Sequence, residues 1–488
     1  MNAGGWGDSL RAYWRGPALE GNARRTYRLH LTYALCDATA GGILLNAPLV
    51  AIKAFEASNW QLYLRELLAG VGMVAALYLG ARMATRRKMP FVFIPGVLAA
   101  CCTLSMSAAV GSPFWFLLLF GLGAMCEIVT RPAITTILRF NYPPERRGHA
   151  TGEVRKWSSL AFMVSNLVSA AALHVAARWP AAMVPLLVEP DGGPTEGYGS
   201  AALRAALLAL NWTAQHIVPL SLAAAGLIGL TGLLCFRRIE VEEGPVDHEA
   251  ASLGIGQALR GVVRVFASNG RYRRYLVGCF LDGFFQMLYF SVIWKLLSDS
   301  LHYGYVGCTV LMHALPALLA FALTGALGRW VDRSNPWISW GWIRLAWGAD
   351  ALLLAAAPLV ALQLPPPYAL AAVVALPVLG RLLRGSVQGV WWILWWQIGV
   401  THFAPPGEST SRYMGIMVFL NGATRALASA VGMVLAARHV APQTLIFMGG
   451  LGVVAAGLYS FYQARRDRLE AQPETIAEFE RRFPAAQF

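Results

Sequence analysis

Charged side chains lie inside long apolar runs of this 488-residue sequence, where a charge is costly to remove from water. Such residues are candidates for ion pairing, for uptake and release of a proton, or for binding a polar solute. The set consists of four acids and five arginines: Asp37, Glu127, Asp282, Asp350, Arg131, Arg344, Arg381, Arg384 and Arg425. Uncharged polar groups in similar runs are Asn166, His313, Gln388 and Asn421.

Glu127 and Arg131 are four residues apart, which places both on one face of a helix. They form either a self-neutralised structural pair or an ion pair that a substrate or a proton opens. Asp37 and Asp282 each lie within an apolar run. Because burial disfavours the charged form of a carboxylic acid, these two could exchange protons near neutral pH. The alternative role of each is a fixed counter-ion of a nearby arginine.

Arg381 and Arg384 share one helix face at a spacing of three, and Gln388 follows one turn beyond Arg384. No acid lies on the same helix, so we expect their partner to be Asp282 or an anionic substrate. Arg425, four residues from Asn421, is a further deep cation. After Gln388 come four tryptophans in two pairs, each pair one turn apart: Trp391, Trp392, Trp395 and Trp396. They predict a belt at the membrane interface, or alternatively a stacking wall for a sugar or an aromatic substrate.

The composition indicates that lipid surrounds the elements that carry these residues. Hydrophobic residues make up 57% of the chain and charged residues 14%, whereas a soluble domain carries about 25% charge. A cytosolic enzyme, a disordered chain and a disulfide-rich secreted module are therefore excluded or disfavoured. The seven cysteines form no C-x-x-C pair, which predicts no metal site, and we expect no cofactor and no nucleic-acid partner.

A run of about 20 apolar residues is long enough to cross a bilayer as a helix. The sequence contains twelve such runs, at 27–53, 64–84, 91–111, 114–138, 157–177, 214–236, 275–297, 305–328, 337–362, 368–398, 413–437 and 443–463. With the N-terminus inside, and with basic residues near the ends of the runs counted with the adjoining connections, the inner connections hold 29 Lys and Arg and the outer ones hold 6. Since basic residues favour the cytoplasmic side, both termini are predicted to be cytoplasmic.

The two halves of the sequence repeat in order, at offsets of 245, 246 and 262 residues. The matched pairs are Asp37 with Asp282, Pro90 with Pro336, and Pro143 with Pro405. Parallel repeats of this kind predict two related six-helix bundles with a substrate site near the midplane between them. The predicted parts are a cytoplasmic segment, a bundle, a linker with an amphipathic helix, a second bundle and a tail: 1–26, 27–236, 237–274, 275–463 and 464–488. The outer connection 178–213 is predicted as an extracellular cap or an extension of the sixth helix.

The loops after the second and eighth runs resemble the major facilitator superfamily, which usually shows G-x-x-x-D-R-x-G-R-R there. The second copy keeps Gly328, Asp332 and Arg333. The first keeps Gly80 and a basic tail that includes Arg86 and Arg87, but has Ala-Thr at the Asp-Arg position. PPERRGHATG, after the fourth run, is similar to another loop of the family. The resemblance implies that these loops latch a cytoplasmic gate. The alternative role of the basic tail in the first copy is only to set the orientation of the chain in the membrane.

The resemblance also implies the all-α major facilitator fold, with the first, fourth, seventh and tenth helices lining a central cavity. These helices carry the residues singled out above: Asp37, Glu127, Arg131, Asp282, Arg381 and Arg384. The ninth helix is peripheral in that fold, so Arg344 and Asp350 are interpreted as structural.

We therefore expect a secondary active transporter of a small polar or anionic solute, coupled to protons and working by alternating access. It would act as a monomer in a bacterial inner membrane. One alternative is a proton antiporter for drugs or hydrophobic solutes. Alternatives of another class are an intramembrane enzyme with Glu127 or His313 as base, and a non-transporting sensor on the same scaffold.

Overall fold

The computed structural model describes residues 19–83, 86–187, 216–241, 255–395, 402–403 and 410–470, and these residues form helices and short connections. Many helices begin at a proline, whose fixed φ suits the first turn and whose missing N–H costs nothing there. Side-chain caps start two others: Asn335 Oδ1 accepts from the backbone N–H of Trp337 (2.9 Å), and Asn269 Oδ1 accepts from that of Tyr272 (3.0 Å). Local sequence thus sets where these helices begin.

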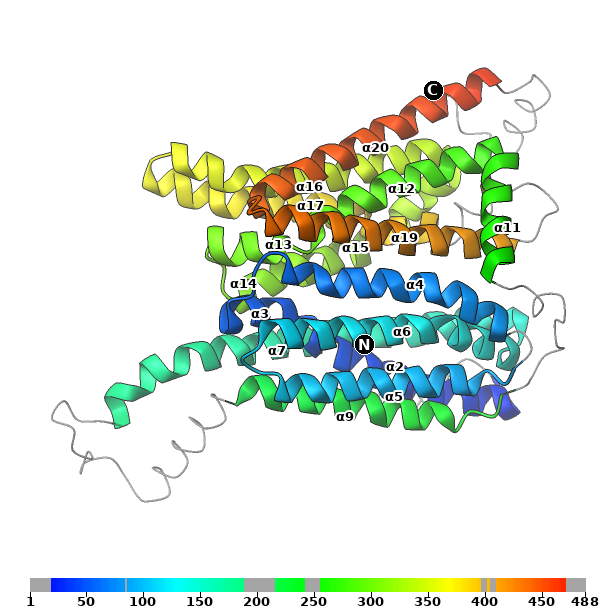
Figure 1. Cartoon of the computed structure of the whole chain (residues 1–488), viewed down its shortest axis with the longest axis horizontal. Coiled ribbons are helices and arrows are strands. Elements are labelled where there is room, and N and C mark those ends of the chain that lie inside the picture. The colour runs from blue at the N-terminus through cyan, green and yellow to red at the C-terminus, as the bar shows by residue number, and fades with distance from the viewer. Residues whose placement is uncertain are drawn as a thin grey trace, which may run out of the picture. The chain divides into compact units, whose positions relative to one another are not determined.

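The described helices group into two compact units, and each is considered by itself (Figure 1). Unit 1 contains α2 (Gly21–Leu44), α3 (Ala47–Phe55), α5 (Met89–Ala108), α6 (Pro113–Asn141), α7 (Pro144–Leu187), α9 (Ile217–Arg237) and α14 (Tyr305–Thr309). Unit 2 contains α4 (Leu64–Met83), α11 (Ile255–Ser268), α12 (Gly270–Phe290), α13 (Ile293–Lys295), α15 (Leu315–Arg333), α16 (Pro336–Gln363), α17 (Pro366–Ile393), α19 (Thr410–Ala437) and α20 (Pro442–Glu470). A 3-10 turn at Gln61–Tyr63 and π-helical turns at Leu296–Ser300 and Val310–Ala314 complete unit 2.

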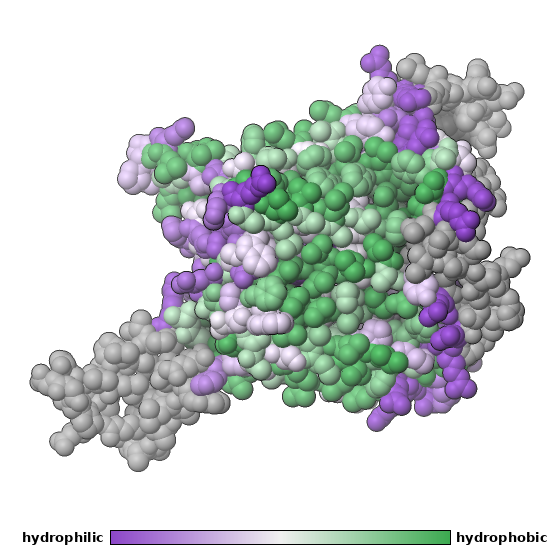
Figure 2. Space-filling model, viewed as in Figure 1, coloured by the Kyte–Doolittle hydropathy of each residue, from purple (hydrophilic) through white to green (hydrophobic). Residues whose placement is uncertain are grey.

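The prediction of an all-helical, multi-pass integral membrane protein is confirmed. Eleven helical segments of the described chain are long and apolar enough to cross a membrane. Large apolar side chains point outward from them, including Phe321 and Leu362, each 84% exposed. Figure 2 shows hydrophobic residues over the middle of the helices and hydrophilic residues at their ends. α4 is a further 20-residue helix outside this count, and the number twelve stays a prediction.

Several predicted boundaries differ from the structure. The predicted loop that contains PPERRGHATG is helical from Pro144 onward, and α7 has 44 residues. Its opposite end, toward Leu187, extends past the neighbouring helices in Figure 1. That loop prediction was wrong because the segment after the proline pair contains no further helix breaker except single glycines, which a helix tolerates. The first predicted span is broken after Leu44, and the seventh after Phe290. The outer connection beyond Leu187 lies outside the described residues.

In unit 1, α2 packs against α7 and α9, and α5 packs against α6 and α9. A buried amide network joins three segments of this unit. Asn46 Nδ2 donates to Asn166 Oδ1 (3.0 Å), and Thr309 Oγ1 donates to Asn46 Oδ1 (2.9 Å). Asn166, one of the polar residues noted in the sequence, is thereby satisfied and 2% exposed, which is a structural role.

In unit 2, α16 packs against both α17 and α20, and α12 packs against α19 and α20. α4, which precedes the predicted linker in the sequence, packs against α19 within this unit. α16 and α20 approach each other closely at Gly348. A Cβ atom there would lie 2.5 Å from Val454 Cγ2 and 3.0 Å from the Gly450 carbonyl oxygen. Only a residue without a side chain allows these two backbones to meet.

We therefore expect Gly348→Ala to lower the free energy of unfolding by about 1–3 kcal/mol, because the added methyl group meets backbone atoms. Gly325→Ala is the matched control, since a Cβ atom on Gly325 of α15 has no neighbour within 4 Å. Alanine is the better helix former, so the control should be neutral or stabilising by up to about 1 kcal/mol. Thermal unfolding of the two purified variants in detergent measures both effects. Equal midpoints would contradict the packing described.

Candidate functional site

Unit 1 brings three of the predicted residues together. Arg131 of α6 pairs with Glu127 one turn earlier on the same helix, as the spacing predicts. Arg131 Nη2 also lies 3.5 Å from Asp37 Oδ2 of α2, so one guanidinium serves two carboxylates. Tyr33 and Arg155 lie within electrostatic reach of this triad. Each triad side chain is accessible, with exposed fractions of 53% for Arg131, 48% for Glu127 and 32% for Asp37.

The shared arginine determines what this triad can do. With both acids ionised, the three side chains carry one net negative charge. A proton on Asp37 would remove that charge while Glu127 stays paired with Arg131, so the arginine would keep a partner in either state. The triad is therefore suited to gain and lose a proton without leaving an isolated charge.

Unit 2 holds the predicted arginines of α17, but their partner differs from the prediction. Asp350 of α16 lies 3.2 Å from Arg381 Nε and 3.7 Å from Arg384 Nη1. Asp282 was the wrong partner, because α17 follows α16 and packs directly against it. Gly380 permits this approach, since a Cβ atom there would lie 2.8 Å from Asp350 Oδ1. Asp350 is fully buried and Arg381 is 1% exposed.

Asp282 of α12 instead pairs with Arg344 of α16, whose Nε lies 3.7 Å from Asp282 Oδ2. Arg344 Nη1 donates to Ser460 Oγ of α20 at 2.5 Å, and its guanidinium lies 4.8 Å from the centre of the Trp340 ring. Arg344 and Asp350 have separate partners, in agreement with the prediction that they do not face each other. Arg344 thus links three helices of unit 2.

Unsatisfied polar atoms accompany these pairs. In the part of the chain that the structure describes, the buried atoms Arg381 Nη2, Gln388 Oε1 and His313 Nε2 have no hydrogen-bond partner. The His313 ring lies 5.3 Å from that of Trp294 and within electrostatic reach of Arg381 and Arg384. Since an unpaired buried polar group costs about 1–3 kcal/mol, a polar ligand or water would be stabilised here. Arg384 Nη1 is 3.3 Å from the Tyr289 hydroxyl and keeps 11% of its side chain exposed.

The sequence interpretation missed Glu66 at the start of α4. Its carboxylate is 3% exposed and pairs with Arg425 of α19 and with Arg65, and Arg425 Nε donates to its Oε2 at 2.5 Å. Glu66 lies two residues inside the predicted span at 64–84. A signal was present, since Arg425 is a deep cation for which the sequence had suggested no acid. Asn421, one turn from Arg425, lies close to Gly283 of α12.

The four charged residues of the predicted gate are exposed in the structure. Asp332 and Arg333 end α15, and no ion pair to either occurs within the described ranges. Arg86 and Arg87 precede α5 and are also exposed. Gly80 lies within α4 and Gly328 within α15. The gating role of these residues stays a prediction.

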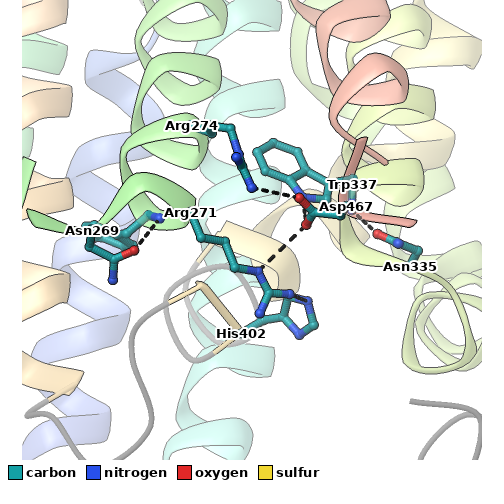
Figure 3. A network of polar contacts seen from close by, with 8 residues as sticks. Asn269, Arg271, Arg274, Asn335, Trp337, His402 and Asp467 are labelled. Carbon is teal, nitrogen blue, oxygen red and sulfur yellow. Dashed lines mark hydrogen bonds and ion pairs between the residues drawn. The ribbon is translucent and has the colours of Figure 1, made fainter. Parts of the chain in front are cut away.

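A different polar network ties one end of unit 2 (Figure 3). Asp467 of α20 accepts from Arg274 Nη2 at 3.0 Å and from Trp337 Nε1 at 2.9 Å, and Arg271 Nε lies 3.7 Å away. Arg271 Nη2 in turn lies 2.9 Å from His402 Nε2. Asp467 escaped the sequence interpretation because it follows the last predicted span. It holds α12, α16 and α20 together at this end.

Two aromatic features complete the description. Trp391 stacks on Trp395 with ring centres 5.7 Å apart, and Trp391 also meets Trp347 of α16 at 5.2 Å. Trp396 and the side chain of Trp392 lie outside the described part, so the predicted stripe is only partly visible. In unit 1, the Tyr142 hydroxyl lies 3.1 Å from His30 Nδ1. Burial raises the pKa of Tyr142, which keeps this hydroxyl protonated.

Comparison with known proteins rests on structure. No family model and no curated protein matches the sequence. A mutant of the nucleoside transporter NupG superposes with a TM-score of 0.61 at 14% identity, covering 90% of this chain and 99% of that one. The POT family transporter PepTSo superposes with a TM-score of 0.58 at 12% identity, covering 92% of this chain and 99% of that one. The third structure is a bacterial homologue of the human lysosomal transporter Spinster, in an inward-facing and occupied conformation. It superposes with a TM-score of 0.53 at 15% identity, covering 90% of this chain and 95% of that one.

The chain has the fold of these transporters. The resemblance to the major facilitator superfamily that the loop motifs indicate is therefore confirmed at the level of the fold.

The paired charges of α16 and α17 generate a stability prediction. Asp350→Asn removes the acid that two buried arginines share, and breaking a buried pair in this way costs about 3–5 kcal/mol. Asp332→Asn is the control, because it removes the same charge from an exposed position and should change stability by less than about 0.5 kcal/mol. Thermal unfolding in detergent distinguishes the two. Similar midpoints for both variants would show that Asp350 does not neutralise the arginines.

Proposed function

We propose that this protein is a secondary active transporter of a small polar or anionic solute, coupled to protons and working by alternating access. The fold supports a transporter in general. The observation that carries the solute class is the interior of unit 2, where three arginines meet only two aspartates among the described residues: Arg344, Arg381, Arg384, Asp282 and Asp350. A buried surplus of positive charge favours an anionic group as its partner.

Three unsatisfied polar atoms of unit 2 favour the same class of solute. A hydrophobic solute would leave Arg381 Nη2, Gln388 Oε1 and His313 Nε2 without partners, whereas a polar one could hydrogen-bond with them. This is why we rank a polar or anionic solute above the drug or hydrophobic solute of the alternative antiporter.

The triad of unit 1 supports proton coupling. Asp37 is the more distant of the two carboxylates that share Arg131, so its protonation disturbs the pairing least. Each charge that crosses the membrane is worth about 2.3 kcal/mol per 100 mV, which is an adequate driving force for uptake.

The remaining parts of the proposal follow from the distribution of charge and from composition. Basic residues concentrate on alternate connections, which supports twelve spans with both termini in the cytoplasm. We further propose the inner membrane of a bacterium as the location and a monomer as the working unit. Nucleosides, for which NupG is named, and peptides, one of which is bound in conjugated form in another similar POT family structure, lead the list for a binding screen.

Reconstituted vesicles separate the classes of function. A transporter exchanges a labelled solute found in a thermal-shift screen, an enzyme changes that solute chemically, and a sensor does neither. Counterflow is thus the first measurement.

Asp37→Asn should abolish solute uptake driven by a pH gradient while leaving solute exchange intact, because the variant binds solute but lacks the titrating group. Asp282→Asn is expected to lose gradient-driven uptake as well, but it also leaves the buried Arg344 without its acid, so its stability is measured alongside. Glu56→Gln removes a charge at an exposed position of unit 1 and should behave as the parent protein. Gradient-driven uptake that is unaltered in both aspartate variants would remove the proton hypothesis.

Arg384→Ala should weaken solute binding more than Arg344→Ala. Arg384 shares Asp350 with Arg381 and remains partly accessible, whereas Arg344 has its own acid and is 1% exposed. Loss of a hydrogen bond to a charged group, about 1.5–3 kcal/mol, corresponds to a rise in Kd of roughly ten- to a hundredfold. Equilibrium binding is measured on monodisperse samples of both variants, so that unfolded protein does not affect the measured Kd. The reverse ranking would contradict the assignment of Arg384.

A further inference from the structure

A cavity of about 440 Å³ lies at one end of unit 1, where α2 begins and α9 ends. Four of its six lining residues are arginines, and the full set is Gly21, Arg24, Arg25, Arg28, Leu29 and Arg238. The four arginine side chains are exposed at this end of the membrane-crossing helices. The cavity lies apart from the ion pairs that the proposed transport uses.

Contacts within unit 1 hold Arg238 opposite the arginines of α2. The chain turns back directly after α9, and the Glu240 carbonyl oxygen accepts from Asn141 Nδ2 at 2.7 Å and from Asn22 Nδ2 at 3.3 Å. Asn141 also donates to Thr26 Oγ1 of α2 at 2.9 Å. These hydrogen bonds join the ends of α2, α6 and α9, so the arrangement of the arginines is built into the fold.

Among the described residues, the ion pairs leave most of the charge of this cavity unbalanced. Arg25 pairs with Glu240. In the part of the chain that the structure describes, the guanidinium groups of Arg24, Arg28 and Arg238 have neither an ion pair nor a hydrogen bond. Three neighbouring like charges repel one another, and a bound anion would relieve that repulsion. Topology alone requires basic residues at this end of the helices but does not require them around one cavity.

Exposed apolar side chains of α9, the helix that leads to Arg238, indicate what carries the anion. Leu234 precedes Arg238 by one helical turn on the same face of α9 and is 46% exposed, and Leu227 on the same helix is 56% exposed. A ligand with a phosphate head and an apolar tail would place the head among the arginines and the tail along these leucines. Basic pockets between membrane helices are a known means of binding anionic lipid head groups.

We propose that this cavity binds the phosphate head group of an anionic phospholipid, held by Arg24, Arg28 and Arg238. The lipid is a partner of the protein at the membrane surface and is distinct from the transported solute.

The test follows the thermal unfolding midpoint, Tm, of the purified full-length protein in detergent. The protein is titrated with dioctanoyl phosphatidylglycerol, with dioctanoyl phosphatidylcholine and with inorganic phosphate. We expect a saturable rise of Tm with phosphatidylglycerol, none with phosphatidylcholine, and none with phosphate at matched concentration. In Arg28→Gln/Arg238→Gln the apparent Kd for phosphatidylglycerol should rise about thirtyfold, or about fivefold for each arginine.

Arg139→Gln/Arg146→Gln is the matched control, because it removes two exposed charges of unit 1 outside the cavity. Its Kd should stay within about twofold of the parent value. If the cavity double variant fails to fold, the single variant Arg24→Gln, with an expected loss of about fivefold, replaces it. Equal weakening in cavity and control variants would overturn the proposal, as would a parent protein that phosphatidylglycerol does not stabilise. Inorganic phosphate that binds as tightly as the lipid would assign the cavity to a free phosphate compound instead.

Discussion

The constraint on which this structure depends is that a charge within the apolar layer must find an opposite charge nearby. The described membrane helices satisfy it with four clusters: Asp37 with Glu127 and Arg131, Asp282 with Arg344, Asp350 with Arg381 and Arg384, and Glu66 with Arg425. In such a setting, the attraction within an ion pair offsets the cost of removing both charges from water only when the two side chains are kept in a favourable geometry. The pairs between helices therefore fix which helices are neighbours within each unit, and glycines such as Gly348 and Gly380 allow those neighbours to approach.

The sequence predicts whatever is local. Hydropathy over a window of one span placed most of the helices, because burial in lipid acts on each helix separately. The Glu127–Arg131 pair was predictable for the same reason, since both residues lie on one helix face. The partner of Arg381 was not predictable from the sequence, because it depends on the rotation of α16 relative to α17 and on the close approach at Gly380. Asp350 was therefore interpreted without its arginines.

Residues at the ends of helices were the hardest to interpret. Glu66 and Asp467 both join helices of unit 2. Glu66 lies near the start of a predicted span, and Asp467 follows the last predicted span. Charges at such positions are common for reasons of topology alone, so hydropathy does not separate a residue that joins helices from one that faces water. Burial separates them: the Glu66 side chain is 3% exposed, whereas Asp332, which the loop motif had favoured, is exposed. Long-range packing decides the difference, and a single sequence does not contain it.

Two sets of ion pairs, one in each unit, carry opposite surpluses, which suggests how coupling could arise under the proposed function. The triad of unit 1 has one more acid than arginines, whereas in unit 2 Asp282 and Asp350 share three arginines. A proton on Asp37 removes the first surplus, and an anionic solute near Arg384 removes the second. Either event alone leaves one net charge to be kept in a poorly polarisable layer, whereas both together leave none. A transporter that changes conformation most easily when it carries the least uncompensated charge would then move proton and solute together. Coupling would need no direct contact between the two ligands, only a shared penalty for unbalanced charge.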